Sequence, residues 1–197
     1  MRQIYPSIQE IKEFVKKSNK KMVIPVWTEI IADLETPVCA YYKVCNDTKY
    51  SYLLESAEGG ESFGRYSFIG ANPLYILKSE ANECVIFNNL TNENINRSND
   101  PYDLLAKFLE EYDSESFGLD YTPGAVGYFG FDSIKYIEPK LSTVVNKVEQ
   151  CENFPEAYFM IAGTVLVFDH LKHKIYVINN ILVDSKSSMY AKLLIAE

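Results

Sequence analysis

The chain has 197 residues, of which 47% are hydrophobic and 14% aromatic, so it is long and apolar enough to bury a core. Its formal net charge of −8 argues against nucleic-acid binding, because such binding depends on lysine and arginine side chains that neutralise phosphates. No apolar run approaches the length of a transmembrane helix, and the amino terminus lacks the uninterrupted apolar core of a signal peptide. We therefore expect a cytoplasmic protein that contacts neither a membrane nor nucleic acid.

The first part of the chain predicts a helix followed by a strand. Ser7 and Glu10 have the spacing of a capping box, which predicts a short amphipathic helix within residues 5–18. Residues 22–27 predict a strand. Pro25 favours an edge position for that strand, because proline lacks the amide donor of a sheet ladder.

Strand patterns dominate the next stretch. Residues 36–44 predict a strand, residues 46–47 a turn, and residues 50–56 a further strand. Residues 66–69 return the chain as the second strand of a hairpin with a long connection.

A second antiparallel pair and a helix are expected after this hairpin. Residues 74–78 and 84–87 predict the pair, with its turn at residues 81–82. Residues 91–99 are rich in asparagine and show no periodicity, so they predict a loop or linker. Asp100-Pro101 then predicts a helix start, with aspartate as the cap and proline at the first helical position.

Glycine recurs at every third position of the next apolar strand, at Gly124, Gly127 and Gly130. Glycine weakens a strand unless a bulge or a neighbouring backbone requires it, so this spacing predicts close packing rather than a phosphate-binding loop. Residues 155–168 and 174–182 predict a long antiparallel pair.

Together these elements predict an α+β fold, mainly of antiparallel sheets in a β-sandwich-like arrangement with helices packed on them. A last helix is expected over residues 185–197, and its abrupt end is what we expect of a chain cut from something longer.

The most informative polar residues lie between Leu53 and Gly70. Glu55, Ser56, Arg65 and Ser67 sit at or beside the ends of two predicted strands. A carboxylate there suits the ammonium of a ligand, and hydroxyl or backbone N–H groups suit its carboxylate, so the stretch fits a zwitterionic small molecule. The alternative is a plain hairpin whose surface charges pair with one another.

Glycines shape the connection of this hairpin. Gly59 and Gly60 suit a turn that needs a positive φ, and Gly64 and Gly70 bracket the returning strand.

The sequence contains no convincing set of catalytic or metal-binding residues. His170 and His173 fall in a predicted turn, where strand alternation separates them, so we favour a solvated turn over a metal site. Glu58 and Glu61 share a loop without a sign of converging, and no Gly-x-Ser-x-Gly elbow occurs. We assign no catalytic residue and no metal ligand.

The cysteines are scattered and form no C-x-x-C motif. In a chain without a secretion signal we expect them to be reduced and to act as small apolar side chains. They are Cys39, Cys45, Cys84 and Cys151.

Three blocks of the sequence resemble the large subunit, component I, of anthranilate synthase. The most specific block follows Thr36-Pro37-Val38 and reads Leu53-Leu-Glu-Ser-Ala-Glu-Gly-Gly-Glu-Ser-Phe-Gly-Arg-Tyr-Ser-Phe-Ile-Gly70. The second reads Gly124-Ala-Val-Gly-Tyr-Phe-Gly-Phe-Asp132, and the third runs from Pro155 to His170. The blocks occur in the order of that family and span most of the chain.

The resemblance implies that residues 1–197 are the amino-terminal regulatory region of an enzyme of tryptophan biosynthesis. That enzyme, a lyase, converts chorismate to anthranilate with ammonia from a glutamine amidotransferase subunit, component II. In the family, the chorismate site, the catalytic groups and the Mg²⁺ ligands lie in the carboxyl-terminal half. The resemblance therefore implies that this fragment alone is inactive and holds no cofactor, while the intact enzyme uses Mg²⁺.

The resemblance also implies a site for tryptophan as feedback inhibitor. It would use Glu55, Ser56 and Ser67, with Leu54 and Phe68 beside them. Glu55 would meet the amino group, Ser56 would contact the polar end or fix the backbone, and the two apolar residues would contact the indole. The other wall of the site would come from the missing carboxyl-terminal half.

Two alternatives remain open from the sequence. One is the same region of aminodeoxychorismate synthase, although the complete Leu53–Gly70 block favours anthranilate synthase. The other is a stand-alone amino-acid-binding module with no enzyme attached.

The carboxyl-terminal half that would form the other wall of the tryptophan site is missing, and this gives two expectations for the isolated chain. It should bind tryptophan weakly or not at all, because buried apolar contact area is lost. It should also cover exposed strand edges and apolar surface by self-association, as a homo-oligomer.

Overall fold

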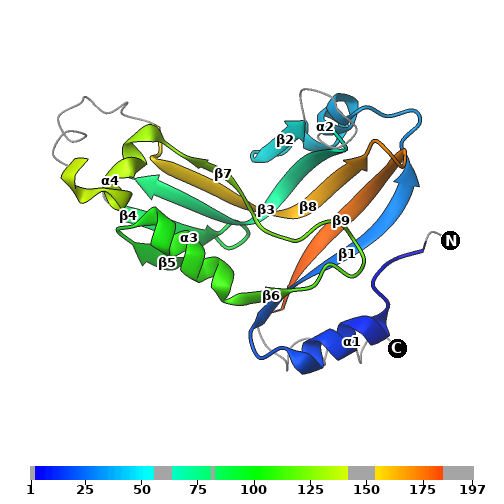
Figure 1. Ribbon diagram of the computed structural model, residues 1–197, viewed down its shortest axis with the longest axis horizontal. Helices are drawn as coiled ribbons and strands as arrows, with labels where there is room; N and C mark the ends of the chain where they lie inside the picture. The colour runs from blue at the N-terminus through cyan, green and yellow to red at the C-terminus, as the bar shows by residue number, and fades with distance from the viewer. Residues whose placement is uncertain (1–2, 56–63, 81–82, 142–153, 184–197) are drawn as a thin grey trace. The chain divides into compact units, whose positions relative to one another are not determined.

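The computed structural model describes residues 3–55, 64–80, 83–141 and 154–183 (Figure 1). Predictions that concern Ser56, Gly59 and Gly60, Cys151, or a helix over residues 185–197 lie outside this described part.

The described helices and strands follow one another in this order. The helical segments are α1 (Ile8–Lys17), α2 (Pro37–Cys45), α3 (Pro101–Glu110), η1 (Phe131–Ser133), α4 (Ile134–Ile137) and η2 (Pro139–Leu141). The strands are β1 (Lys21–Ile31), β2 (Ser51–Glu55), β3 (Tyr66–Glu80), β4 (Glu83–Asn88), β5 (Asn94–Ser98), β6 (Tyr112–Ser114), β7 (Ala125–Phe129), β8 (Ala157–Asp169) and β9 (Lys174–Val183).

Contacts divide the chain into two compact units. The first unit comprises residues 1–73, 111–123 and 162–197, and the second comprises residues 74–110 and 124–161. The boundaries cut through β3 and β8, so each of these long strands contributes residues to both units.

Hydrogen bonding joins nine described strands in the order β5-β4-β3-β8-β9-β1-β6, with β2 beside β3 and β7 beside β8. Every register that we describe is antiparallel except that of β1 with β6. The prediction of an α+β fold with mainly antiparallel strands is confirmed. The two longest of these strands, β3 and β8, have 15 and 13 residues.

Local capping chemistry fixes two helices as predicted. The Ser7 side chain accepts from the backbone of Glu10, whose carboxylate accepts from the backbone of Ser7, a complete capping box at the start of α1. Asp100 Oδ1 likewise accepts from the backbone N–H groups of Tyr102 and Asp103 at the start of α3.

The prediction of a strand over residues 36–44 is wrong, because this segment forms α2. Thr36 is its N-cap and accepts a hydrogen bond from the backbone N–H of Cys39, while Pro37 occupies the first turn. Threonine followed by proline is a helix-start signal, since the fixed φ of proline suits the first helical position. The capping signal outweighs the high strand propensity of the valines and tyrosines.

The prediction of a loop over residues 91–99 is also wrong in part. Residues 94–98 form β5, which pairs with β4, and the chain reaches it through a turn in which Asn88 accepts from the backbone of Leu90 and Thr91. The side chains of β5 are exposed or half-buried, so the strand lacks the apolar alternation that sequence reasoning uses.

Pro25 occupies a position in β1 that needs no hydrogen-bond donor. The backbone N–H of Trp27 points toward Tyr5, and residues two apart point the same way, so the nitrogen of Pro25 faces that side too. Pairing with β6 ends at Val23 on β1, so the proline lies where the described residues offer no neighbouring strand. This explains how proline is accommodated inside an 11-residue strand.

The strands of the first unit have two apolar faces. One face, which we call the α2 face, packs beneath α2. The strands contribute Ile69, Ala71, Leu166, Phe168 and Ile175 to this buried cluster, and α2 contributes Ala40 and Cys45, with Leu53 and Tyr41 partly buried against them. The opposite face holds Leu119, Ala162, Val165, Val167 and Ile178, with Tyr52, Tyr66 and Phe68 partly buried against them.

Gly127 of β7 lies where a side chain cannot fit. A Cβ there would come within 2.0 Å of the carbonyl oxygen of Tyr158 and 2.6 Å of the Cα of Phe159. Close packing, predicted from the glycine spacing, is therefore confirmed at this position, whereas Gly124 has nothing within 4 Å.

Replacing Gly127 with alanine should lower the free energy of unfolding by about 3 kcal/mol, because backbone atoms of β8 must shift to admit the methyl group. Urea denaturation followed by circular dichroism measures the change. Gly124→Ala is the matched control and should leave stability within about 0.5 kcal/mol, since its methyl group enters open space. Equal destabilisation by the two substitutions would contradict the packing argument.

Candidate functional site

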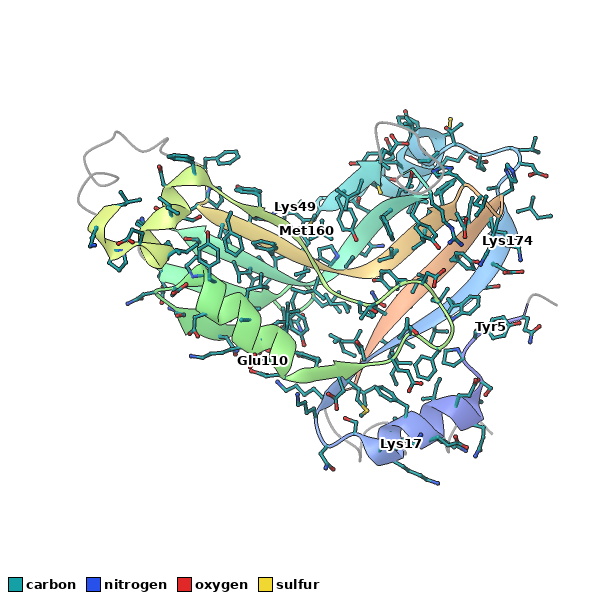
Figure 2. The ribbon with its side chains drawn as sticks, viewed as in Figure 1. Tyr5, Lys17, Lys49, Glu110, Met160 and Lys174 are labelled. Carbon is teal, nitrogen blue, oxygen red and sulfur yellow. The ribbon has the colours of Figure 1, made fainter. Side chains whose placement is uncertain are left out.

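The start of β3 is anchored to the turn between β8 and β9 by an ion pair between the half-buried Arg65 and the buried Asp169. Arg65 donates from Nε to Oδ1 of Asp169 at 3.2 Å and from Nη2 to Oδ2 at 2.8 Å. The Asp169 side chain is 1% exposed, and its Oδ1 also accepts from the backbone N–H groups of Leu171 and Lys172. Lys174, labelled in Figure 2, marks where this turn enters β9.

Charge and hydrogen bonding determine the ionisation of Asp169. Burial alone would raise the pKa of this carboxyl, but the Arg65 guanidinium and the backbone N–H of Lys172 stabilise its charged form. The net result is a pKa below the ordinary value for aspartate, so Asp169 is a carboxylate at neutral pH.

A hydroxyl and an imidazole meet beside this anchor. Oγ of Ser67 lies 2.8 Å from Nε2 of His170, and the His170 backbone N–H donates to the carbonyl of Arg65. The His170 ring lies over that of Phe168, with ring centroids 6.2 Å apart. Ser67 is only 3% exposed, whereas His170 is exposed, so the imidazole is the part of this pair that solvent reaches.

Glu55 stands directly across the strand pair from Ser67. The two residues are Cα partners in the antiparallel register of β2 and β3. Opposed residues in such a pair project to the same face, with Cβ atoms about 5 Å apart. Ser67 and Ile69 are two residues apart on β3, so their side chains project to the same face. Ile69 belongs to the α2 face, and Glu55 and Ser67 therefore lie on that face too.

The predicted indole contacts lie on the other side of the sheet. Leu54 and Phe68 are Cα partners one position along, and alternation directs them to the opposite face, where Phe68 packs against its apolar cluster. Leu54 is 46% exposed. The structure therefore brings Glu55 and Ser67 together and places Leu54 and Phe68 away from them.

The opposite face carries a second polar contact. The Tyr66 hydroxyl donates to Oδ2 of Asp120 at 2.8 Å. Desolvation, followed by this hydrogen bond, raises the pKa of Tyr66 to about 12. A cavity of about 20 Å³ lined by Tyr66, Asp120, Lys172 and Tyr176, among others, has room for roughly one water molecule, which is too small for an amino acid.

Two members of this arrangement were missed from the sequence. Asp169 and His170 lie 104 and 103 residues from their partners Arg65 and Ser67, so no local pattern links them. The expected solvated turn does form at Asp169–His173, but its first two residues bind the start of β3.

Within the described part of the chain, no group of three or more histidine, cysteine, aspartate or glutamate residues is placed to hold a metal ion. None of the helices described is both long and apolar enough to cross a membrane. Cys39, Cys45 and Cys84 carry free thiols.

Comparison with known proteins identifies relatives over most of the chain. No family model matches the sequence. Anthranilate synthase component 1 of Synechocystis is 37% identical over 180 residues, which cover 89% of this chain and 34% of that protein. Anthranilate synthase component 1 of Acetivibrio thermocellus is 35% identical over 182 residues, which cover 91% and 35%. The crystal structure of anthranilate synthase component I from Streptococcus pneumoniae is 27% identical, with a TM-score of 0.48 over 85% of this chain and 35% of that one.

The chain is similar over most of its length to one class of protein, component 1 of anthranilate synthase, and it spans about a third of the length of the curated relatives it matches. The resemblance to component I of anthranilate synthase found in the three sequence blocks is therefore confirmed.

Proposed function

We propose that this chain is the amino-terminal regulatory region of an anthranilate synthase component I and carries one wall of a site for tryptophan as feedback inhibitor. The observation that carries this proposal is the placement of Glu55 opposite Ser67 on one face of the β2–β3 pair. The kinship with anthranilate synthase component 1 supplies the class of enzyme.

The site fits the polar end of an amino acid. Glu55 is exposed at the last position of β2, and a carboxylate there suits charge-assisted hydrogen bonds from an ammonium group. The buried hydroxyl of Ser67 lies across from it on β3, and the exposed ring of His170 on the β8–β9 turn contacts that hydroxyl. Imidazole and hydroxyl donors there suit the carboxylate of the same ligand.

The described residues enclose the ligand on one side only. Tryptophan needs apolar enclosure for its indole, and the expected contacts Leu54 and Phe68 lie on the opposite face. The remaining wall is therefore assigned to the part of the enzyme that this chain does not span. Tryptophan then inhibits by preferring one arrangement of the whole enzyme, because a ligand shifts an equilibrium only through differential affinity.

In the whole enzyme, the proposed reaction converts chorismate to anthranilate, with ammonia from component II and with Mg²⁺. As the resemblance implies, we assign the residues for that chemistry to the part of the enzyme that lies beyond the third matched by this chain. The chain alone is therefore expected to be inactive. The intact enzyme is expected in the cytoplasm.

A chimaera tests this function directly. This chain should replace the matching residues of the Synechocystis protein, which is 37% identical to it, and the product should form anthranilate from chorismate and ammonia. Anthranilate fluorescence measures the rate, and added L-tryptophan should inhibit it because this chain provides the wall that contains Glu55. The unaltered Synechocystis protein is the control. An active chimaera that tryptophan does not inhibit, beside a control that it does inhibit, would contradict the regulatory role.

A further inference from the structure

The sheet of the second unit has two edges in the described part of the chain, and only one of them carries charged side chains. Its strands follow the order β5-β4-β3-β8, with β7 beside β8. Residues Ala157–Ile161 of β8 pair with β7, so β5 and β7 are the outermost described strands of this unit. Strand β5 bears Arg97, which pairs with Glu83, whereas Ala125–Phe129 of β7 contains no charged residue. A charge on an edge strand discourages pairing with a further strand, so β7 is the less protected edge.

The backbone of β7 faces β8 and the outside of the sheet by turns. The N–H of Gly130 donates to the carbonyl of Glu156, so this residue and those two and four positions before it face β8. The intervening residues Ala125, Gly127 and Phe129 direct their N–H and C=O groups away from β8. We call these groups the open edge of β7, since no described strand pairs with them.

Gly127 gives independent support for this orientation. It is the Cα partner of Phe159, and a Cβ on it would lie 2.6 Å from the Cα of Phe159. Such a close approach is typical of a non-hydrogen-bonded antiparallel pair, in which the N–H and C=O groups point away from the neighbouring strand. Gly127 is also exposed, and because glycine has only backbone atoms, the exposed surface belongs to the backbone. Solvent therefore reaches the open edge at this residue.

The open edge is complementary to itself. Gly127 is the middle residue of β7, so a second copy that runs antiparallel about a two-fold axis places Gly127 opposite Gly127 and Ala125 opposite Phe129. The opposed residues then exchange backbone hydrogen bonds, up to about six in all. The small side chain of Ala125 leaves room for the ring of Phe129, which is stacked on Tyr102 with ring centroids 3.9 Å apart.

An exposed aromatic ring lies beside the same strand. Phe154 stacks on Tyr128 with ring centroids 5.4 Å apart, and Phe154 is 70% exposed. In the two-fold arrangement Val126 of one copy lies opposite Tyr128 of the other, and an aromatic ring against a β-branched side chain is a favourable cross-strand pair. Pairing of two copies would therefore also cover part of the Phe154 ring, an apolar surface that a monomer leaves in water.

We propose that the open edge of β7 is an interaction surface for a second copy of this chain, which extends the sheet of the second unit into a two-fold antiparallel dimer centred on Gly127. Self-association is expected from the sequence in general terms, and the open edge adds the strand, the register and the symmetry. The dimer does not depend on the tryptophan site, whose described residues lie in the first unit.

The dimer should be weak. A five-residue strand and one exposed ring from each copy bury less than the roughly 1,200 Å² at which stable interfaces begin. We therefore expect a dissociation constant of about 100 µM. At this value the chain is mostly monomeric at about 20 µM and mostly dimeric at about 500 µM.

Two measurements on the 197-residue chain test the dimer. Sedimentation equilibrium between about 20 and 500 µM should show a monomer in equilibrium with a dimer. Hydrogen exchange followed by NMR should show the Gly127 amide exchanging roughly threefold more slowly at about 500 µM than at about 20 µM, because it is hydrogen-bonded to the second copy. Leu34, which is 95% exposed in the first unit, is the internal control, and its amide should exchange equally fast at both concentrations.

Variants locate the interface on β7. Ala125→Pro removes one N–H of the open edge at the first position of the strand, where proline is tolerated, and should weaken the dimer at least roughly fivefold. Gly124→Ala is the matched control, because it keeps its N–H and adds a methyl group in open space, so the dissociation constant should not change. Phe154→Ser leaves the sequence of β7 unaltered and should weaken the dimer roughly threefold through lost apolar contact.

The outcomes decide between this surface and others. A monomer across the whole concentration range would overturn the proposal. So would a dimer in which the exchange of Gly127 is unchanged, because self-association would then use another surface. Circular dichroism shows whether Ala125→Pro is folded, and if it is not, the Gly127 exchange rate and Phe154→Ser decide. A dimer that Phe154→Ser and a folded Ala125→Pro leave equally tight would also contradict an interface at the open edge.

Discussion

Replacing Asp169 with asparagine should lower the free energy of unfolding by about 2–3 kcal/mol, one of the largest effects that the described structure predicts for a near-isosteric change. The carboxylate is 1% exposed and receives two hydrogen bonds from Arg65 and two from backbone N–H groups. Asparagine keeps an oxygen for the backbone donors but presents neither the charge nor the second acceptor that the guanidinium uses. The loss in the free energy of unfolding therefore measures how much the ion pair between the β8–β9 turn and the start of β3 stabilises the fold.

Urea denaturation near pH 7 measures this loss. Glu83→Gln is the control, because it breaks the ion pair of Glu83 with Arg97, in which both side chains are about half exposed, and such pairs contribute little to stability. A change for Asp169→Asn no larger than that of the control would show that the pairing of Asp169 with Arg65 does not anchor the turn.

The stability difference between the unaltered chain and Asp169→Asn should change with pH in a definite direction. The folded pKa of Asp169 is below its ordinary value of about 3.9, so its ionisation stabilises the fold above that value. As the pH falls through the lowered folded pKa, the carboxylate is protonated and the contribution is lost. The stability advantage over Asp169→Asn should therefore be full near pH 6 and shrink steadily below about pH 4.

Features that depend on a few consecutive residues are the ones that the sequence predicts well. The capping box at Ser7 and Glu10 and the Asp100-Pro101 start of α3 are local chemistry, and both helices begin where that chemistry indicates. The segment that begins at Thr36-Pro37 shows the limit of this approach, because its strand-forming side chains predict a strand whereas the same kind of cap begins α2 there.

The sequence likewise predicts only part of the candidate site. The β2–β3 hairpin and its polar residues follow from the sequence, whereas Leu54 and Phe68, expected beside Glu55, lie on the opposite face because successive strand residues alternate. The pairing of Ser67 with His170 does not follow, because the two residues are 103 positions apart and meet only through the strand order. Contacts of this kind depend on tertiary structure, for which a single sequence has no periodic signal.

The second large effect concerns the carboxylate of Glu55. Glutamine has nearly the same shape but no charge, so Glu55→Gln in the chimaera removes the charge-assisted hydrogen bond to the ligand's ammonium and leaves the β2 strand intact. Loss of such a bond weakens binding by about tenfold or more. Glu83→Gln, which neutralises an exposed glutamate of β4 in the second unit, is the control for the loss of one negative charge.

The concentration of L-tryptophan that halves the rate of anthranilate formation, compared between the chimaera and its Glu55→Gln variant, tests the central claim most directly. We predict that this concentration rises by about tenfold or more in Glu55→Gln and stays unchanged in Glu83→Gln. An unchanged concentration in Glu55→Gln, in a variant that still folds and forms anthranilate, would contradict the claim that the exposed end of β2 binds the inhibitor.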